Sequence, residues 1–229
     1  MFKLSKNKKI DNKKGFTMIE LIVVIAIFGI LTGITVFNYG KFNNNIIMTN
    51  MAYEIALSVR EAQVFSLGVR GSNENGETSF DIKYGVYFNS DPDGDQQNFV
   101  FFADRNSNGT CEMDNNGNAC SIDACLDGAF NECESLNTLT RGISITGICV
   151  SPTGEEPMNL DTGDCSENDF NVDEATVTFE RPNPDAFVYD IAGDRVFSNM
   201  AILIEANNDA KRAINISENG QISVEFINN

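Results

Sequence analysis

The first long pattern in the chain is an apolar run behind a basic stretch. Residues 16–37 carry a single charge, Glu20, whereas residues 1–14 contain six lysines. At about 1.5 Å per residue the run makes a helix of about 33 Å, enough to cross a hydrocarbon core of about 30 Å. Lysine-rich flanks stay in the cytoplasm, so the chain after about residue 38 is expected outside it. The Glu20 carboxylate is costly in such a segment unless it is compensated or reaches the lipid headgroups.

Two simpler interpretations of this segment stay open, a secretory signal peptide and a plain membrane anchor. A signal peptide has an apolar region of about 7–15 residues followed by a small-residue cleavage site. Here the apolar run is longer, and the small residue Gly15 precedes it. We therefore expect a leader over residues 1–15, cleaved on the N-terminal side of the run, and a transmembrane helix over residues 16–38.

A helical period continues beyond the apolar run. Apolar residues recur at steps of three and four from Met48 to Val69, and Gly68 and Gly71 then interrupt the pattern. This spacing predicts an amphipathic continuation of the helix over residues 39–71. We expect its apolar face to pack against a sheet.

The period then changes to that of strands within an extracytoplasmic domain over residues 72–229. Asn219 and Gly220 form a strong hairpin signal between the last two candidate strands. One long helix followed by strands predicts an α+β domain with an antiparallel sheet. The candidate strands are Ser79–Lys83, Gly85–Phe88, Phe99–Ala103, Ile143–Val150, Ala175–Glu180, Ala201–Ala206, Arg212–Ile216 and Gln221–Ile227.

Charge and composition narrow the function. The chain carries 16 basic and 33 acidic residues, a formal charge of −17. Residues 1–15 hold six of the basic and one of the acidic residues, so their removal leaves 10 basic and 32 acidic residues, a formal charge of −22. So acidic a surface argues against nonspecific nucleic-acid binding. There is no histidine, and no catalytic constellation is recognisable, so we expect no enzyme activity and no required cofactor.

All the cysteines follow the membrane segment. Their number is six, and the compartment is expected to be oxidising, so disulfides are the leading interpretation. The pairing is open, because six cysteines allow 15 connectivities. A thiolate zinc site is the rival interpretation, although the spacing lacks close CxxC pairs. The candidates are Cys111, Cys120, Cys125, Cys133, Cys149 and Cys165.

A segment over about residues 89–137 is rich in Asp, Asn, Gly and Cys and predicts a long ordered loop insertion. Within it, Asp104, Asn106 and Asn108 match the opening of a calcium-binding loop, D-x-N-x-N-G. Position twelve is Asn115 rather than glutamate, with Glu112 and Asp114 nearby. Both a Ca²⁺ site at these residues and a solvated turn stay open, since Asp, Asn and Gly also favour turns.

The sequence Lys14-Gly15-Phe16-Thr17-Met18-Ile19-Glu20-Leu21-Ile22-Val23-Val24-Ile25-Ala26-Ile27 closely resembles the leader of type IV pilins and type II secretion pseudopilins. That resemblance implies cleavage between Gly15 and Phe16 by a prepilin peptidase, followed by N-methylation of Phe16. It also implies that Glu20 faces an N-terminal amine, often that of a neighbouring subunit in the filament.

A second resemblance covers part of the extracytoplasmic domain. Residues 52–63, Tyr84–Phe88, Arg212–Ile216 and Gly220–Val224 resemble the helix and strands of minor pseudopilin H and the FimT-like minor pilins. The expected function is therefore that of a minor pilin or pseudopilin, a structural subunit of a type IV pilus or a type II secretion pseudopilus.

The family resemblance also implies location and partners. The chain is expected as a single-pass protein of the bacterial inner membrane, in the lipid bilayer before assembly and then in a periplasmic or cell-surface filament. Its partners would be the prepilin peptidase, other pilin subunits and a membrane assembly platform. The alternative is a filament-tip adhesin, or a ligand- or DNA-uptake subunit, that binds through the Cys/Asp-rich loop.

Overall fold

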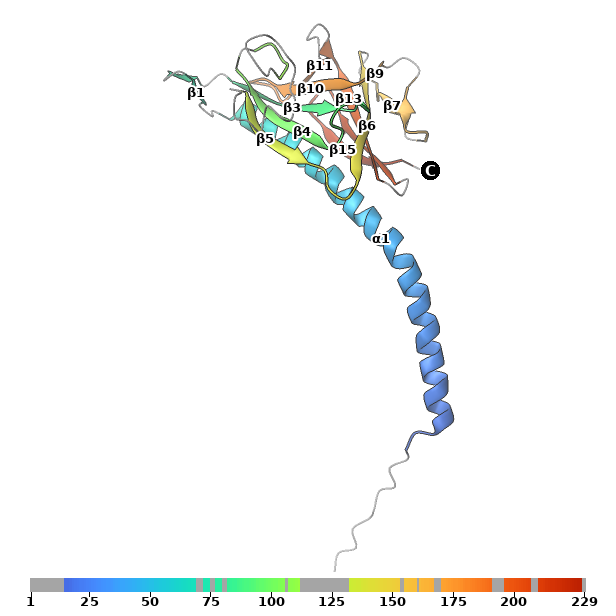
Figure 1. Cartoon of the computed structure of the whole chain (residues 1–229). Helices are drawn as coiled ribbons and strands as arrows, with labels where there is room; N and C mark the ends of the chain where they lie inside the picture. Colours follow the sequence, from blue (N-terminus) through green and yellow to red (C-terminus); the bar gives the residue numbers. More distant parts are fainter. Residues whose placement is uncertain are drawn as a thin grey trace, which may run out of the picture. The chain divides into compact units, whose positions relative to one another are not determined.

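The chain divides into two units, Met1–Asn43 and Asn44–Asn229. One helix, α1, runs from Met18 to Leu67 and supplies residues to both units. Figure 1 shows the order of the elements along the chain. The computed structural model describes residues 15–68, 72–74, 77–79, 82–105, 107–111, 132–152, 155–159, 161–166, 170–190, 196–206 and 210–227.

The second unit contains two larger antiparallel sheets. The first is six-stranded, in the order β12-β11-β10-β3-β4-β5, and the second is five-stranded, in the order β15-β14-β13-β6-β9. The strands of the first sheet are β3 (Lys83–Asn89), β4 (Asn98–Asp104), β5 (Cys133–Thr138), β10 (Glu174–Phe179), β11 (Ala186–Asp190) and β12 (Val196–Phe197).

The second sheet and two small hairpins complete the strands of the described chain. The second sheet is formed by β6 (Ile143–Ser151), β9 (Phe170–Val172), β13 (Asn199–Ala206), β14 (Lys211–Ile216) and β15 (Ile222–Phe226). The two hairpins are β1 (Ser72–Glu74) with β2 (Glu77–Ser79), and β7 (Met158–Asn159) with β8 (Asp164–Cys165).

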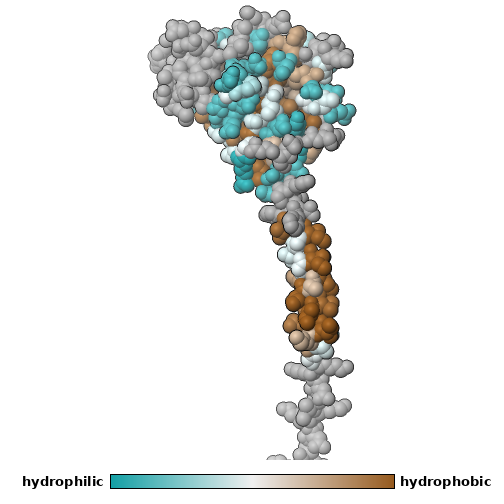
Figure 2. Space-filling model, turned by 45° about the vertical axis from the view of Figure 1, so that its right-hand side comes forward, coloured by the Kyte–Doolittle hydropathy of each residue, from teal (hydrophilic) through white to brown (hydrophobic). Residues whose placement is uncertain are grey.

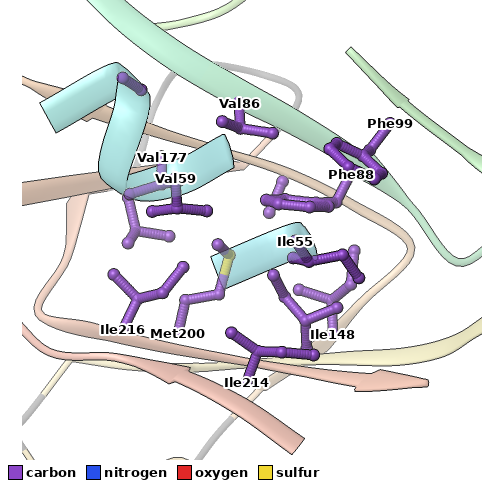
Figure 3. Close-up of a cluster of buried hydrophobic side chains, with 14 of the residues drawn as sticks. Ile55, Val59, Val86, Phe88, Phe99, Ile148, Val177, Met200, Ile214 and Ile216 are labelled. Atoms are coloured by element: carbon purple, nitrogen blue, oxygen red, sulfur yellow. The ribbon is translucent and has the colours of Figure 1, made fainter. Parts of the chain in front are cut away.

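The part of α1 in the second unit, residues 44–67, is called the domain half here. The core lies where this domain half meets the inner faces of both sheets (Figure 3). One stripe of the helix is fully buried and comprises Met48, Ala52, Ile55, Val59 and Ala62. Ile55 and Val59 lie among side chains from both sheets, such as Val86 and Phe88 of β3 and Ile214 and Ile216 of β14. The helical period of the sequence thus records a buried face.

Two polar side chains fix the end of α1 to the sheets. Gln63 is buried, and its Nε2 donates to the carbonyl oxygens of Pro184 at 2.9 Å and Gly220 at 3.1 Å. Ser66 Oγ accepts the N–H of Tyr84 at 2.7 Å and donates to the Tyr84 carbonyl at 3.2 Å. Both side chains thus give hydrogen-bond partners to backbone groups of the segments packed against α1.

The outer face of each large sheet is also covered in part. On the first sheet a cluster of Tyr87, Val100, Phe102 and Cys111 is buried, with Cys133 and Leu136 packed against it. On the second sheet the β7–β8 hairpin contributes Met158 and Cys165 to a cluster with Ala201, Leu203, Ala213, Cys149 and Ile227. The strands therefore bury side chains on both faces, unlike a sheet with one solvated side.

The structure confirms the α+β class and the helix packed on antiparallel strands. The expectation of a single sheet is wrong, because the strands divide between two larger sheets that share the core around α1. The expected strand over 79–83 is also wrong as a unit. Its ends fall in β2 and β3, and residues 80–81 lie outside the described residues.

The expected loop insertion over about 89–137 needs correction. It contains β4 and most of β5, and β4 pairs with both β3 and β5 in the first sheet. Only the connection from Arg105 to Glu132 separates these two strands, and residue 106 and residues 112–131 of it lie outside the described chain. The candidate strand Phe99–Ala103 is confirmed as part of β4, and its residues are buried because β4 pairs on both sides and is covered on both faces.

Candidate functional site at the start of the long helix

The first turn of α1 is closed by the side chains of Thr17 and Glu20. Glu20 Oε2 accepts hydrogen bonds from the Thr17 N–H and the Thr17 hydroxyl, each at 2.9 Å. Thr17 Oγ1 accepts the Glu20 N–H at 3.3 Å, and the Leu21 N–H bonds to the Thr17 carbonyl oxygen at 3.2 Å. This reciprocal arrangement is a capping box, which satisfies N–H groups that the helix cannot pair internally.

Thr17 is a site residue that the sequence reasoning missed. Its signal was available, because Thr-x-x-Glu directly before an apolar run is the sequence signature of a capping box. The predicted cleavage between Gly15 and Phe16 would leave this box intact, since the Thr17 N–H belongs to the peptide bond that follows Phe16. Among the described residues the hydrogen bonds to the Glu20 carboxylate all use its Oε2.

The helix segment that follows presents apolar side chains on all sides. Met18–Val36 is long and apolar enough to cross a membrane, and none of its residues is buried. In Figure 2 the visible face of this segment is mostly hydrophobic. Gly29 and Gly33 have no atom within 4 Å of the position that a Cβ would take. A helix that is apolar all round requires a surrounding membrane or other helices.

The predicted calcium loop is partly described. The side chain of Asp104 is fully buried, and its two oxygens accept the N–H groups of Asn108 at 3.1 Å and Gly109 at 3.0 Å. Asn108 Oδ1 accepts the Thr110 N–H at 2.9 Å, as in an Asx turn. In the described part these oxygens serve backbone groups. Asn106, Glu112 and Asp114 lie outside it, so Ca²⁺ binding stays a prediction.

The turn that follows Asp104 is anchored on the outer face of the first sheet. Burial raises the pKa of Asp104, while the backbone hydrogen bonds and the Lys83 ammonium act in the opposite direction. Gly109 has φ of 81° and lies so close to Tyr189 that a Cβ would come within 2.4 Å of the ring. Its carbonyl accepts the Thr176 hydroxyl at 2.7 Å. The start of this connection is therefore an ordered part of the domain.

The cysteines bear on the predicted disulfides. Cys149 of β6 and Cys165 of β8 form a disulfide that ties the β7–β8 hairpin to the second sheet. Cys111 and Cys133 are disulfide-bonded as well. Cys120 and Cys125 lie outside the described residues. Within the described ranges no three His, Cys, Asp or Glu side chains gather in a way that could hold a metal ion.

Comparison with protein families agrees with the chemistry of the helix start. Residues 10–36 match the family described as the prokaryotic N-terminal methylation motif. Neither the curated proteins nor the solved structures gave a match to the chain. The apolar helix and its motif are consistent with an inner-membrane protein that later enters a filament. The chain therefore carries the N-terminal methylation motif of the type IV pilin and type II pseudopilin superfamily and is a prepilin-like protein.

Proposed function

We propose that the chain is a minor pilin or pseudopilin, a structural subunit of a type IV pilus or a type II secretion pseudopilus. The N-terminal methylation motif at residues 10–36 implies processing by a prepilin peptidase and assembly with other pilins, in a structural role. The observation that carries the proposal is the segment Met18–Val36, which is unburied, apolar and capped by Thr17 and Glu20. The segment needs lipid first and neighbouring helices later.

Glu20 is assigned the role of setting the register between subunits. The Phe16 amine exists only after cleavage at Gly15, whereas Glu20 is present from synthesis. Because the capping box uses Oε2, the Oε1 atom, which has no hydrogen bond within the described residues, can accept the charged amine of a neighbour without uncapping the helix. A charge-assisted hydrogen bond of this kind is strong in an apolar surrounding. The helix exchanges lipid contacts for helix contacts on entering the filament, so it keeps its apolar burial.

Two substitutions at Glu20 separate capping from charge. Glu20→Gln keeps a side chain that suits a capping box but removes the charge, whereas Glu20→Ala removes both. We expect both variants to be cleaved and N-methylated at Phe16, as measured by mass spectrometry, and to enter filaments at least tenfold less than the wild type. Glu61→Ala, at an exposed acidic residue on the same helix, is the matched control and should enter normally.

The outcomes of this experiment test two statements. A wild-type chain that is not cleaved between Gly15 and Phe16 in the presence of a prepilin peptidase contradicts the prepilin function. Normal entry of Glu20→Gln into filaments contradicts the charge role of Glu20 while leaving the prepilin function in place. The further assignment to the pseudopilin H group rests on the resemblance of residues 52–63 and of the strands at Tyr84, Arg212 and Gly220.

A filament-tip binding subunit is the second candidate. Its support is the packing at the two ends of the connection between β4 and β5. At these ends the Asp104 carboxylate accepts two backbone N–H groups, and Cys111 is buried in a cluster against which Cys133 packs. Replacing residues 112–131 by a short linker should leave filament number unchanged and abolish surface or ligand binding. A loss of filaments in that variant assigns the connection to assembly instead. The formal charge of −17 argues against DNA as the ligand.

A further inference from the structure

Arg212 of β14 is a buried cation without a carboxylate partner among the described residues. Arg212 as a whole residue is 7% exposed. Its nitrogens donate to the carbonyl oxygen of Lys211 at 2.7 Å and to Thr49 Oγ1 at 3.4 Å. Its Nε is buried with no hydrogen-bond partner, and burial lowers the pKa of the guanidinium. No ion pair joins it to any acidic residue of the described chain.

This absence contrasts with the composition of the chain. There are 33 acidic residues for 16 basic ones, and each of three other cations of the described ranges, Lys83, Arg105 and Lys211, has a carboxylate. Glu205, close in the sheet, pairs with Lys211 at 3.5 Å. A buried charge without a counter-charge is unfavourable, and since the described chain supplies none, a carboxylate from another chain would relieve this cost.

The surroundings of Arg212 are those of an interface centre. The guanidinium carbon lies 4.1 Å from the centroid of the Phe226 ring, and Phe226 is 59% exposed. Phe226 is directly opposite Arg212 in the pairing of β14 with β15. Exposed aromatic rings next to an arginine are typical of the residues that dominate binding at protein interfaces.

The free edge of the second sheet lies beside this pair. β15 is the terminal strand, and within the described residues only β14 pairs with it. Ile222 and Val224 share the face of Phe226, because they lie opposite Ile216 and Ile214, and they pack only partly against the core. An edge strand with unpaired backbone groups and incompletely covered apolar side chains can accept an added strand.

We infer that β15 and Arg212 form a docking surface for an extended, acidic protein segment of another chain. The segment would pair with the backbone of β15 and cover Val224 and Phe226 with apolar side chains. A carboxylate on that same face would supply the counter-charge that Arg212 lacks. The occupant is a strand with alternating apolar and acidic residues.

The binding test uses the full chain in detergent micelles and two synthetic peptides. One is a blocked six-residue peptide of alternating valine and glutamate, and the other has glutamine in place of glutamate. We expect the acidic peptide to bind at least tenfold more tightly, with the largest amide shifts in the nuclear magnetic resonance spectrum along β15. Equal affinity of the two peptides, or shifts elsewhere, overturns the proposal.

Variants of the chain make the test specific to Arg212. Arg212→Met keeps the length of the side chain and removes the charge, so the preference for the acidic peptide should vanish while the unfolding midpoint is equal or higher. Phe226→Glu places a carboxylate opposite Arg212 within the chain and should also abolish the preference. Phe226→Gln is its uncharged control and should keep the preference.

The remaining outcomes are also decisive. A lower unfolding midpoint for Arg212→Met, with the peptide preference unchanged, assigns Arg212 to stability alone and contradicts the proposal. Self-association of the wild-type chain through β15 without any peptide makes a second copy the occupant and overturns the acidic segment. None of these measurements requires a filament, so their failure is distinct from failure of the pilin function.

Discussion

The two halves of α1 belong to one hydrogen-bonded helix and meet opposite surroundings. Met18–Val36 has no buried residue, whereas the domain half contains a stripe from Met48 to Ala62 that is fully buried. The first half is apolar on every side, and the second is apolar on one face, with polar and charged residues among those on the other. One backbone conformation therefore serves two partners, and the distribution of side chains alone distinguishes them.

Polar contacts differ between the halves in the same way. In the first half, Thr17 and Glu20 bond to each other within one turn, and Thr35 bonds to carbonyl oxygens of its own helix. In the second half, Gln63 and Ser66 bond to segments more than 15 residues away in the sequence. The polar side chains named in the first half thus bond within their own helix, whereas Gln63 and Ser66 bond to segments packed against theirs.

The largest expected difference concerns two residues on opposite faces of the domain half. Ile55 is 0% exposed and Leu57 is 67% exposed. Ile55→Ala should lower the free energy of unfolding by about 2–5 kcal/mol, because it leaves a cavity in the core. Leu57→Ala should change it by less than about 0.5 kcal/mol. Denaturant unfolding of the full chain, followed by circular dichroism, measures both, and equal losses would remove the distinction.

The polar anchor at the end of α1 should have the next largest effect. Ser66→Ala leaves the N–H and carbonyl of Tyr84 without their buried partner, so we expect a loss of about 1–3 kcal/mol in the free energy of unfolding. Ser58→Ala, at a half-buried position of the same helix, is the control and should change it by less than about 0.5 kcal/mol. A similar loss in both variants would assign the effect to helix propensity.

Replacing glycine by alanine should raise stability at Gly29, in the first half of α1, and lower it at Gly220, in the domain. Gly29→Ala should stabilise the helix of the isolated chain by about 1 kcal/mol, because alanine is the better helix former and nothing lies within 4 Å. Amide hydrogen exchange around Gly29 in micelles measures this gain. Gly220→Ala should destabilise the chain, since φ is 76° and a Cβ would lie 1.9 Å from the Pro184 carbonyl oxygen. A destabilising Gly29→Ala in the isolated chain would contradict the contrast.

The smallest expected effect is at the capping box. Thr17→Val removes the hydroxyl but leaves the Thr17 N–H to bond Glu20, so the first turn should lose about 0.5–1 kcal/mol. Faster hydrogen exchange of the Glu20 and Leu21 amides should report it, with the denaturant unfolding of the domain unchanged. Thr35→Val is the control in mid-helix, where the hydroxyl bonds only to helix carbonyls. Faster exchange in the control alone would contradict the capping role.

The helix and most central strands were predictable because burial leaves a period in the sequence. Ile55 and Val59 stand four apart on one face, and Ile214 and Ile216 stand two apart on another. The division into two sheets was not predictable, because it depends on pairings such as Ala175 with Phe88 that no local pattern records.

The candidate site was predictable to a different degree at each residue. Glu20 is recognisable as the one charge of an apolar run, and Thr17 is recognisable from the Thr-x-x-Glu spacing of a capping box. At Asp104 the motif letters do not record that the carboxylate accepts the backbone N–H groups of Asn108 and Gly109, and Ca²⁺ binding there stays a prediction. The Cys149–Cys165 disulfide required knowing that β8 returns to β6, which the spacing does not state.

The bond from Gln63 to Gly220 has a consequence for the timing of folding. Gly220 lies 157 residues after Gln63, so a polypeptide that emerges N-terminus first offers this acceptor long after α1 has been made. Until β14 and β15 have been synthesised, one side of the buried stripe of α1 stays uncovered. The half-finished domain thus passes through a stage in which its spine is exposed to chaperones and proteases, and the final hairpin ends that stage.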